Sequence, residues 1–314
     1  MTILPKLPNE QFHQLVPLLR EKGFYEAEEP RAINWPEYND SMINEAHEVL
    51  TFIRDEVDKI QVTRFEGKVG KPLTNPRSLA KAILVCEALH LTERAAQGWL
   101  SLLGSFLGIH EHLDDRTIGD AYNRPEVLII LRKIFEKNKD SDGILCGDGT
   151  GLETSRKQNY ESSKNTSEYM TSIVDSREIV QAFDASGEHE NKAMHKLIEE
   201  ASGDSIRLDA GFNDRELTKR LTEKGMIPYI FPKKNNILNG GPAWKLMYLE
   251  LLLDVMVWLT EYHIRSHSES FHASFKQKYG PVTKRRDAAM ILQVTARIIL
   301  HNRRRLAYFS RLQS

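Results

Sequence analysis

The stretch Ile144-Leu145-Cys146-Gly147-Asp148-Gly149-Thr150-Gly151-Leu152-Glu153 marks the point where the character of the chain changes. The residues before it have helical patterns, whereas this short apolar run, with small residues and one acid, is typical of a strand. It follows the turn-forming sequence Lys139-Asp140-Ser141-Asp142-Gly143. We therefore predict that a sheet begins here and that Asp148 lies on its first strand.

Downstream of this strand, the pattern predicts alternating strands and helices. Strand candidates at 169–174 and 178–183 are separated by only three residues, which indicates a hairpin. A later strand at 205–209 ends in Asp209. The remaining predicted elements are helices at 190–201 and 213–224 and a strand at 226–231. Together they predict an α/β fold, with a mixed sheet flanked by helices.

Upstream of the sheet, the chain is predicted to be all helical. Amphipathic spacing and capping residues favour helices at 9–23, 41–62, 78–90, 92–107, a short one after Asp114, and 125–138, with loops at 30–40 and 64–77. Short helices joined by tight turns are compatible with a helix-turn-helix DNA reader, in which Arg116, Thr117 and Asn123 would lie on the reading surface. An ordinary helical bundle is the alternative.

The C-terminal part is predicted to return to helices, at about 244–277 and 284–308. Residues 261–276 contain neither Gly nor Pro, so they are predicted to be helical. On a helix, one side would carry Tyr262, Arg265, Glu269, His272 and Lys276, and the other Ile264, Phe271 and Phe275. The polar side is either a functional stripe or a solvated face, and His272 either a DNA contact or a hydrogen-bonded bystander.

The composition is that of a globular protein, with 314 residues, 40% hydrophobic residues and a net charge of −1. No secretory signal opens the chain and its two cysteines form no metal or disulfide pattern, so we expect a protein of a reducing, cytoplasmic setting. Residues 1–50 carry four cations against nine acids, and residues 255–314 carry eleven cations against three acids. The basic end predicts a contact with a polyanion, unless it is a solvated helix face.

Three acids stand at distinctive places: Asp148 on the first strand, Asp209 at the end of a later strand, and Glu269 on the C-terminal polar stripe. Carboxylates without a His or Cys cluster favour a hard cation, Mg²⁺ or Mn²⁺. Two such ions can clamp the attacking and leaving oxygens of a displacement at phosphorus. Arg265 and Lys276 would then hold nucleic-acid phosphates. Alternatively, each acid only caps the end of a strand or helix at the surface.

Four segments resemble bacterial and archaeal insertion-sequence transposases. Tyr262, Arg265, Glu269 and Lys276 have the Y-(2)-R-(3)-E-(6)-K spacing of that family. Asp148-Gly149-Thr150-Gly151-Leu152 is similar to its first acidic motif. Asp209-Ala210-Gly211-Phe212 is similar to the second, where Tyr is more usual than Phe212. The stretch Ile230-Phe231-Pro232-Lys233-Lys234-Asn235 resembles the basic loop of the family.

The resemblance implies a ribonuclease-H-like fold and a DDE transposase that cleaves DNA at element ends and transfers strands into target DNA. It implies two Mg²⁺ ions, with Mn²⁺ as the alternative, held by the catalytic residues Asp148, Asp209 and Glu269. The expected DNA contacts are Tyr262, Arg265, Lys276, Lys233, Lys234, Arg303 and Arg304. The partners would be the terminal inverted repeats, target DNA and a second copy in a homodimer on DNA.

The expected domains are a helical N-terminal region at 1–140, which would bind the DNA ends, and a ribonuclease-H-like catalytic domain with C-terminal helices at 141–314. Asp209 and Glu269 are only 60 positions apart. That interval has no room for the β-rich insertion that supports a hairpin intermediate in some relatives. Two alternatives stay open: a DNA-binding protein of transposase origin that no longer transposes, and a ribonuclease-H-like nuclease.

Overall fold

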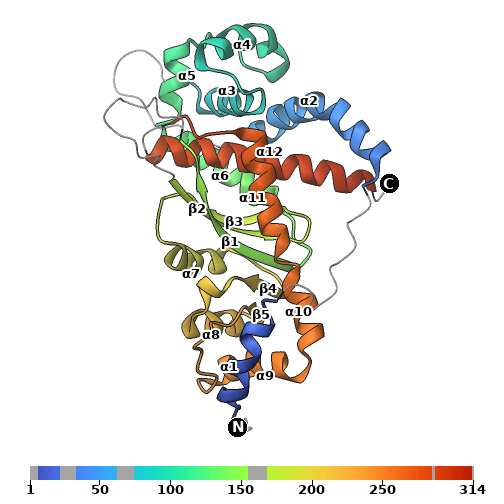
Figure 1. Ribbon diagram of the computed structural model, residues 1–314. Coiled ribbons are helices and arrows are strands. Elements are labelled where there is room, and N and C mark those ends of the chain that lie inside the picture. The colour runs from blue at the N-terminus through green and yellow to red at the C-terminus, as the bar shows by residue number, and fades with distance from the viewer. Residues whose placement is uncertain (1–5, 22–32, 62–73, 155–167, 285–286, 313–314) are drawn as a thin grey trace, which may run out of the picture. The chain divides into compact units, whose positions relative to one another are not determined.

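The computed structural model describes residues 6–21, 33–61, 74–154, 168–284 and 287–312 (Figure 1). The chain forms two compact units, each assembled from separate segments. We call them the sheet unit, with residues 1–32, 140–151 and 169–274, and the helical unit, with residues 33–139, 152–168 and 275–314. The chain therefore passes between the units more than once.

The sheet unit contains a mixed sheet of five strands in the order β3-β2-β1-β4-β5 (Figure 1). The strands are β1 (Ile144–Leu152), β2 (Glu168–Asp175), β3 (Val180–Asp184), β4 (Ser205–Leu208) and β5 (Ile227–Ile230). β4 runs parallel to both β1 and β5, and β2 and β3 form an antiparallel pair. This arrangement confirms the predicted α/β fold and is consistent with a ribonuclease-H-like fold.

Helices cover this sheet and supply the other side of its core. They are α1 (Asn9–Leu18), α7 (Glu190–Glu200), α8 (Arg215–Glu223), α9 (Pro242–Leu253), α10 (Val255–His263) and the first part of α11 (Ser266–Tyr279), with the short 3₁₀ helix η1 (Ala210–Phe212) after β4. Met194 and Leu217 pack in one core with the strand residues Leu145 and Ile206. Burying such side chains stabilises the unit by about 1.5–3 kcal/mol each.

The helical unit contains α2 (Trp35–Asp58), α3 (Pro76–Ala88), α4 (Glu93–Leu107), α5 (Asp115–Ala121), α6 (Pro125–Lys137) and α12 (Asp287–Leu312). α3 is buried from Ser78 to Glu87, which makes it the central helix of this unit. α2 begins at Trp35, so the prediction of a loop through residue 40 is wrong there. Asn34 caps the helix and Pro36 lies in its first turn, where proline is tolerated.

The acidic helix α2 neutralises much of the basic C-terminal end. The ion pairs join Arg304 Nε to Glu45 at 2.7 Å, Lys278 Nζ to Glu45 at 3.1 Å, Arg311 Nε to Asp40 at 2.9 Å and Arg303 Nη2 to Glu48 at 4.0 Å. The uneven charge along the sequence is thus partly an internal complementarity within the helical unit. Pairing with an external polyanion is not needed to explain these four cations.

One prediction about the C-terminal helices is wrong: residues 261–276 are not a single helix. α10 ends at His263 and α11 begins at Ser266. The backbone bonds at this junction link residues three apart, from the Arg265 amide to the Tyr262 carbonyl and from His267 to Ile264. The Ile264 carbonyl also accepts a hydrogen bond from Cys146 Sγ at 3.3 Å. A contact with β1 therefore accompanies this break, although neither Gly nor Pro is present.

None of the helices among the described residues is both long enough and apolar enough to cross a membrane.

Gly147 allows β1 to approach its neighbours closely. A Cβ at this position would lie 2.6 Å from Leu208 Cδ2 and 2.8 Å from Met194 Cε. We expect Gly147→Val to lower the free energy of unfolding by about 1–3 kcal/mol, because the buried neighbours must shift. The midpoint of urea unfolding measures this change.

Gly98→Ala in α4 is the matched control, since a Cβ there meets nothing within 4 Å. Alanine is the better helix former, so this variant is expected to gain up to about 1 kcal/mol. An unchanged midpoint for Gly147→Val would show that β1 tolerates a side chain at this position.

Candidate active site

The strand register brings Asp148 and Asp209 to the same level of the sheet. β1 and β4 are parallel and pair Gly147 with Leu208, so the next residue on each strand is one of the two aspartates. The Asp148 carboxylate accepts a hydrogen bond from the Gly149 amide at 2.9 Å. Asp209 caps η1 by accepting from the Ala210 amide at 2.5 Å. The two acids therefore lie at the same level on neighbouring strands, Asp148 within β1 and Asp209 directly after β4.

Arg265 links Asp148 to Glu269. It lies at the junction between α10 and α11, where its Nη1 is 3.4 Å from Asp148 Oδ2 and its Nη2 pairs with Glu269 Oε1. The Arg265 side chain is only 19% exposed, whereas that of Glu269 is 57% exposed. Three residues of the predicted site are thus joined by two ion pairs, one of which connects residues 117 positions apart.

The three acids share one electrostatic environment. Burial raises the pKa of Asp148 from 3.8 to about 6, and the carboxylates of Asp209 and Glu269 add to the rise. The Gly149 amide and Arg265 act in the opposite direction. Burial by itself lowers the pKa of Arg265, but Tyr262, Glu269 and Asp148 raise it more, so the guanidinium stays charged. The site therefore concentrates negative charge that needs a cation.

Asp148, Asp209 and Glu269 have the chemistry of a divalent-metal site. Carboxylate oxygens are the donors that Mg²⁺ and Mn²⁺ prefer. The pKa of Asp148 is raised mainly by burial and to a smaller extent by the neighbouring carboxylates, and a bound cation would favour the ionised form. As placed, no group of three or more His, Cys, Asp or Glu side chains in the described ranges is arranged to hold a metal. The guanidinium of Arg265 provides the positive charge instead, so metal binding at these acids would require it to move.

Tyr262 closes one side of the site and is buried rather than presented on an open stripe. Its ring stacks on Trp258 at 5.3 Å, and Arg265 Cζ lies 6.0 Å from its centroid. Burial raises its pKa well above 10, so the phenol stays protonated. Beside it is a cavity of about 470 Å³, lined by Tyr262, Asp209, Leu19, Arg20, Glu21, Ala210, Phe231 and His263.

The sequence interpretation missed two residues that hold α10 in place, Arg207 on β4 and Glu261 on α10. The buried Arg207 donates from Nε to the Glu261 carbonyl at 3.0 Å and forms an ion pair with the Glu261 carboxylate. Glu261 directly precedes Tyr262, so its contacts with Arg207 help to position Tyr262. A charged residue inside the apolar strand Ser205-Ile206-Arg207-Leu208 was the available signal.

The other predicted contact residues differ in their surroundings. Lys233 and Lys234 are exposed after β5, and Lys276 is exposed on α11. Arg303 and Arg304 are paired with acids of α2, as described above. His272 is buried, and its Nε2 lies 3.0 Å from Ser172 Oγ. Of its two predicted roles, His272 therefore takes that of a hydrogen-bonded bystander.

Asp148 is expected to make the metal-free protein less stable as pH rises. Its folded pKa of about 6 exceeds the unfolded value of 3.8, so protonation favours the folded state and this contribution is lost as pH rises through about 6. Asp148→Asn removes the ionisation. In EDTA, its melting temperature should exceed that of the wild type at about pH 8 and match it at about pH 4. Equal temperatures at both pH values would contradict this expectation.

Comparison with known proteins adds one match. A family model described as transposase DDE domain matches residues 139–303. The matched segment is just over half of the chain and contains Asp148, Asp209 and Glu269. No curated protein matches the chain, and no solved structure does.

Proposed function

Because the chain belongs to the transposase DDE domain family, we propose that it is an insertion-sequence transposase that cleaves DNA at element ends and joins them to target DNA. The observation that carries the proposal is the convergence of Asp148, Asp209 and Glu269, with Arg265 paired to two of them. A carboxyl group whose pKa is raised, as that of Asp148 is, beside other carboxylates is typical of catalytic sites.

Asp148, Asp209 and Glu269 would hold the metal. Two bound Mg²⁺ or Mn²⁺ ions would activate the attacking oxygen and stabilise the leaving oxygen of an in-line displacement at phosphorus. In cleavage, a water oxygen bonds to phosphorus and the bond to the 3′ oxygen breaks, which leaves a 3′-hydroxyl on the element end. In strand transfer, that hydroxyl bonds to a target phosphorus and displaces a target 3′ oxygen. Each attacking group loses its proton to solvent, and each leaving oxygen gains one.

Arg265 has a separate part in this scheme. It is neutralised by Asp148 and Glu269, and a DNA phosphate is an equivalent anionic partner for its guanidinium. Transfer of Arg265 from the carboxylates to the phosphate would hold the scissile group in place and free the acids for metal. The ring of Tyr262, stacked on Trp258, lies beside the guanidinium.

Other parts of the chain would bind the rest of the DNA. Lys233, Lys234 and Lys276 are exposed cations suited to phosphate contacts, and the helical region before the sheet would bind the element ends. Bringing two ends together requires two sites, so a homodimer on nucleoid DNA is expected. The interval from Asp209 to Glu269 is occupied by η1, α8, β5, α9 and α10. Excision is therefore proposed to proceed without a hairpin supported by a β-rich insertion.

The test is an assay with purified protein, Mg²⁺ and DNA carrying the element's terminal inverted repeats. We expect cleavage at the repeat ends and joining of a pre-cut end into a target plasmid, both abolished by EDTA. Cleavage without joining would identify a nuclease instead. Binding to the repeats without cleavage or joining would identify a DNA-binding protein of transposase origin.

A further inference from the structure

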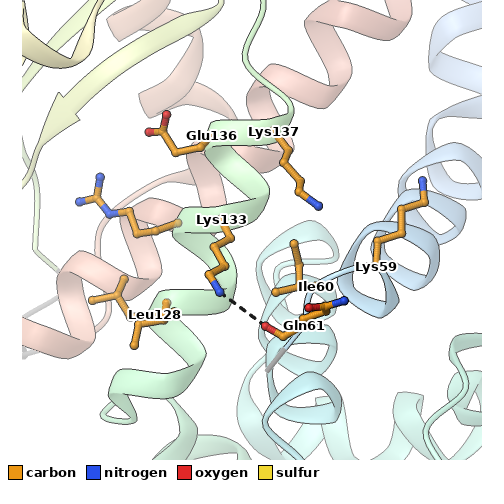
Figure 2. Close-up of a pocket in the computed structure, with 9 residues that line it drawn as sticks. Lys59, Ile60, Gln61, Leu128, Lys133, Glu136 and Lys137 are labelled. Atoms are coloured by element: carbon orange, nitrogen blue, oxygen red, sulfur yellow. Dashed lines mark hydrogen bonds between the residues drawn. The ribbon is translucent and has the colours of Figure 1, made fainter. Parts of the chain in front are cut away.

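A second cationic feature lies in the helical unit, in a cleft between the C-terminal end of α2 and one side of α6 (Figure 2). Its volume is about 770 Å³. The residues that line it are Lys59, Ile60 and Gln61 at the end of α2, and Leu128, Ile129, Arg132, Lys133, Glu136 and Lys137 on α6. None of them belongs to the candidate active site. The lining contains four cations and a single acid, so its charge is unbalanced.

Nearby carboxylates remove only part of this imbalance, at Lys59. Glu136 pairs with Lys139 at 2.7 Å, and Glu56 pairs with Lys59 at 2.5 Å. Figure 2 shows the Glu136 carboxylate directed away from the Nζ atoms of Lys133 and Lys137. Lys133 Nζ is 3.5 Å from the Gln61 carbonyl, which carries no net charge. Within the described parts of the chain, neither Lys133 nor Lys137 forms an ion pair with a carboxylate.

The helix dipole explains only some of the lysines that line this cleft. Lys59 and Lys137 lie at helix C-termini, where a cation is favourable. Lys133 lies one turn earlier and is exposed, so the helix dipole does not account for it. Ile129, Lys133 and Lys137 follow one another at four-residue spacing and form a stripe along one face of α6. Ile129 is 50% exposed beside these two cations.

We propose that this cleft binds the phosphodiester backbone of DNA. Four helical residues correspond to a rise of roughly 6 Å, which is about twice the axial spacing of phosphates along one strand, about 3.4 Å. Lys133 and Lys137 therefore contact phosphates of one strand from α6, and Lys59 faces the same backbone from α2. Ile129 packs against the apolar face of the deoxyribose. The choice of DNA as the ligand rests on the proposed function. The cleft itself is separate from the catalytic acids.

The experiment measures how DNA affinity depends on salt for the full chain and for the double variant Lys133→Gln/Lys137→Gln. Fluorescence anisotropy with a labelled inverted-repeat duplex gives the affinity between about 50 and 200 mM salt. Loss of two phosphate contacts should reduce the slope of log K against log salt by about 1.8. The matched control is Lys192→Gln/Lys219→Gln, two exposed lysines of the sheet unit, for which the slope should not change. Circular dichroism checks that both variants fold.

The outcomes separate this proposal from the proposed function. An unchanged slope, with wild-type DNA binding intact, would overturn the cleft assignment and leave the transposase assignment in place. A labelled polyglutamate peptide that binds the wild type and not the double variant, with an unchanged DNA slope, would also overturn it and indicate an acidic protein partner. A wild type that does not bind DNA would remove both proposals.

Discussion

Replacing Glu269 by glutamine is expected to slow Mg²⁺-dependent DNA cleavage by at least about 1000-fold and to leave DNA binding close to that of the wild type. The amide keeps the shape of the side chain but loses the charge that a metal ligand needs. Metal chemistry supplies several kcal/mol of transition-state stabilisation, and each 1.4 kcal/mol corresponds to about tenfold in rate. Single-turnover cleavage of inverted-repeat DNA measures the loss.

Two further measurements make this result specific. Glu223→Gln, in a side chain 63% exposed on α8, is the control and should cleave at the wild-type rate. DNA affinity should be retained in Glu269→Gln, because Arg265 can still pair with Asp148 or with phosphate. Wild-type cleavage by Glu269→Gln would sink the catalytic assignment. Loss of both cleavage and binding would instead indicate that the site had lost its structure.

Replacing Arg297 by methionine should destabilise the helical unit by about 3–5 kcal/mol. Arg297 on α12 is buried and donates from Nε to Glu87 Oε2 on α3 at 2.7 Å. Glu87 also accepts hydrogen bonds from Tyr122 at 2.7 Å and Gln293 at 2.9 Å. Without the guanidinium, the carboxylate stays buried without a counter-charge, which is costly. Urea unfolding at neutral pH measures the change.

A second variant tests whether charge is the cause. Glu87→Gln/Arg297→Met removes the buried charge and retains an oxygen acceptor, so it should recover more than half of the lost stability. Arg94→Met is the exposed control: Arg94 is 90% exposed and pairs with Asp115 at 3.3 Å, so its loss should change stability by less than about 0.5 kcal/mol. If the double variant is as unstable as Arg297→Met, lost packing rather than buried charge is responsible.

Much of the sheet could be predicted because its signals are local. The strands β1, β4 and β5 are short apolar runs, and the helices between them carry amphipathic spacing and capping residues such as Asp214. The sequence placed Asp148 on the first strand and Asp209 at the end of a later one, but the parallel pairing of β1 with β4 that brings them to one level comes from the tertiary structure. The start of α2 at Trp35 was predicted wrongly as loop, because a proline in the first turn of a helix resembles a loop signal.

The α/β character and the order of the elements could be predicted from the sequence, since they depend on neighbouring residues and on strand periodicity. The same local pattern pointed to the three acids as candidates. The break at Ile264, the pairing of Arg265 with Asp148 and Glu269, and the burial of Tyr262 arise from long-range contacts in the folded chain. The tertiary structure also decided that cations near the C-terminus are matched by acids of α2. These features depend on contacts between residues far apart in the chain, such as Cys146 with Ile264 and Arg304 with Glu45. Such contacts form only when the units fold, so no local spacing encodes them.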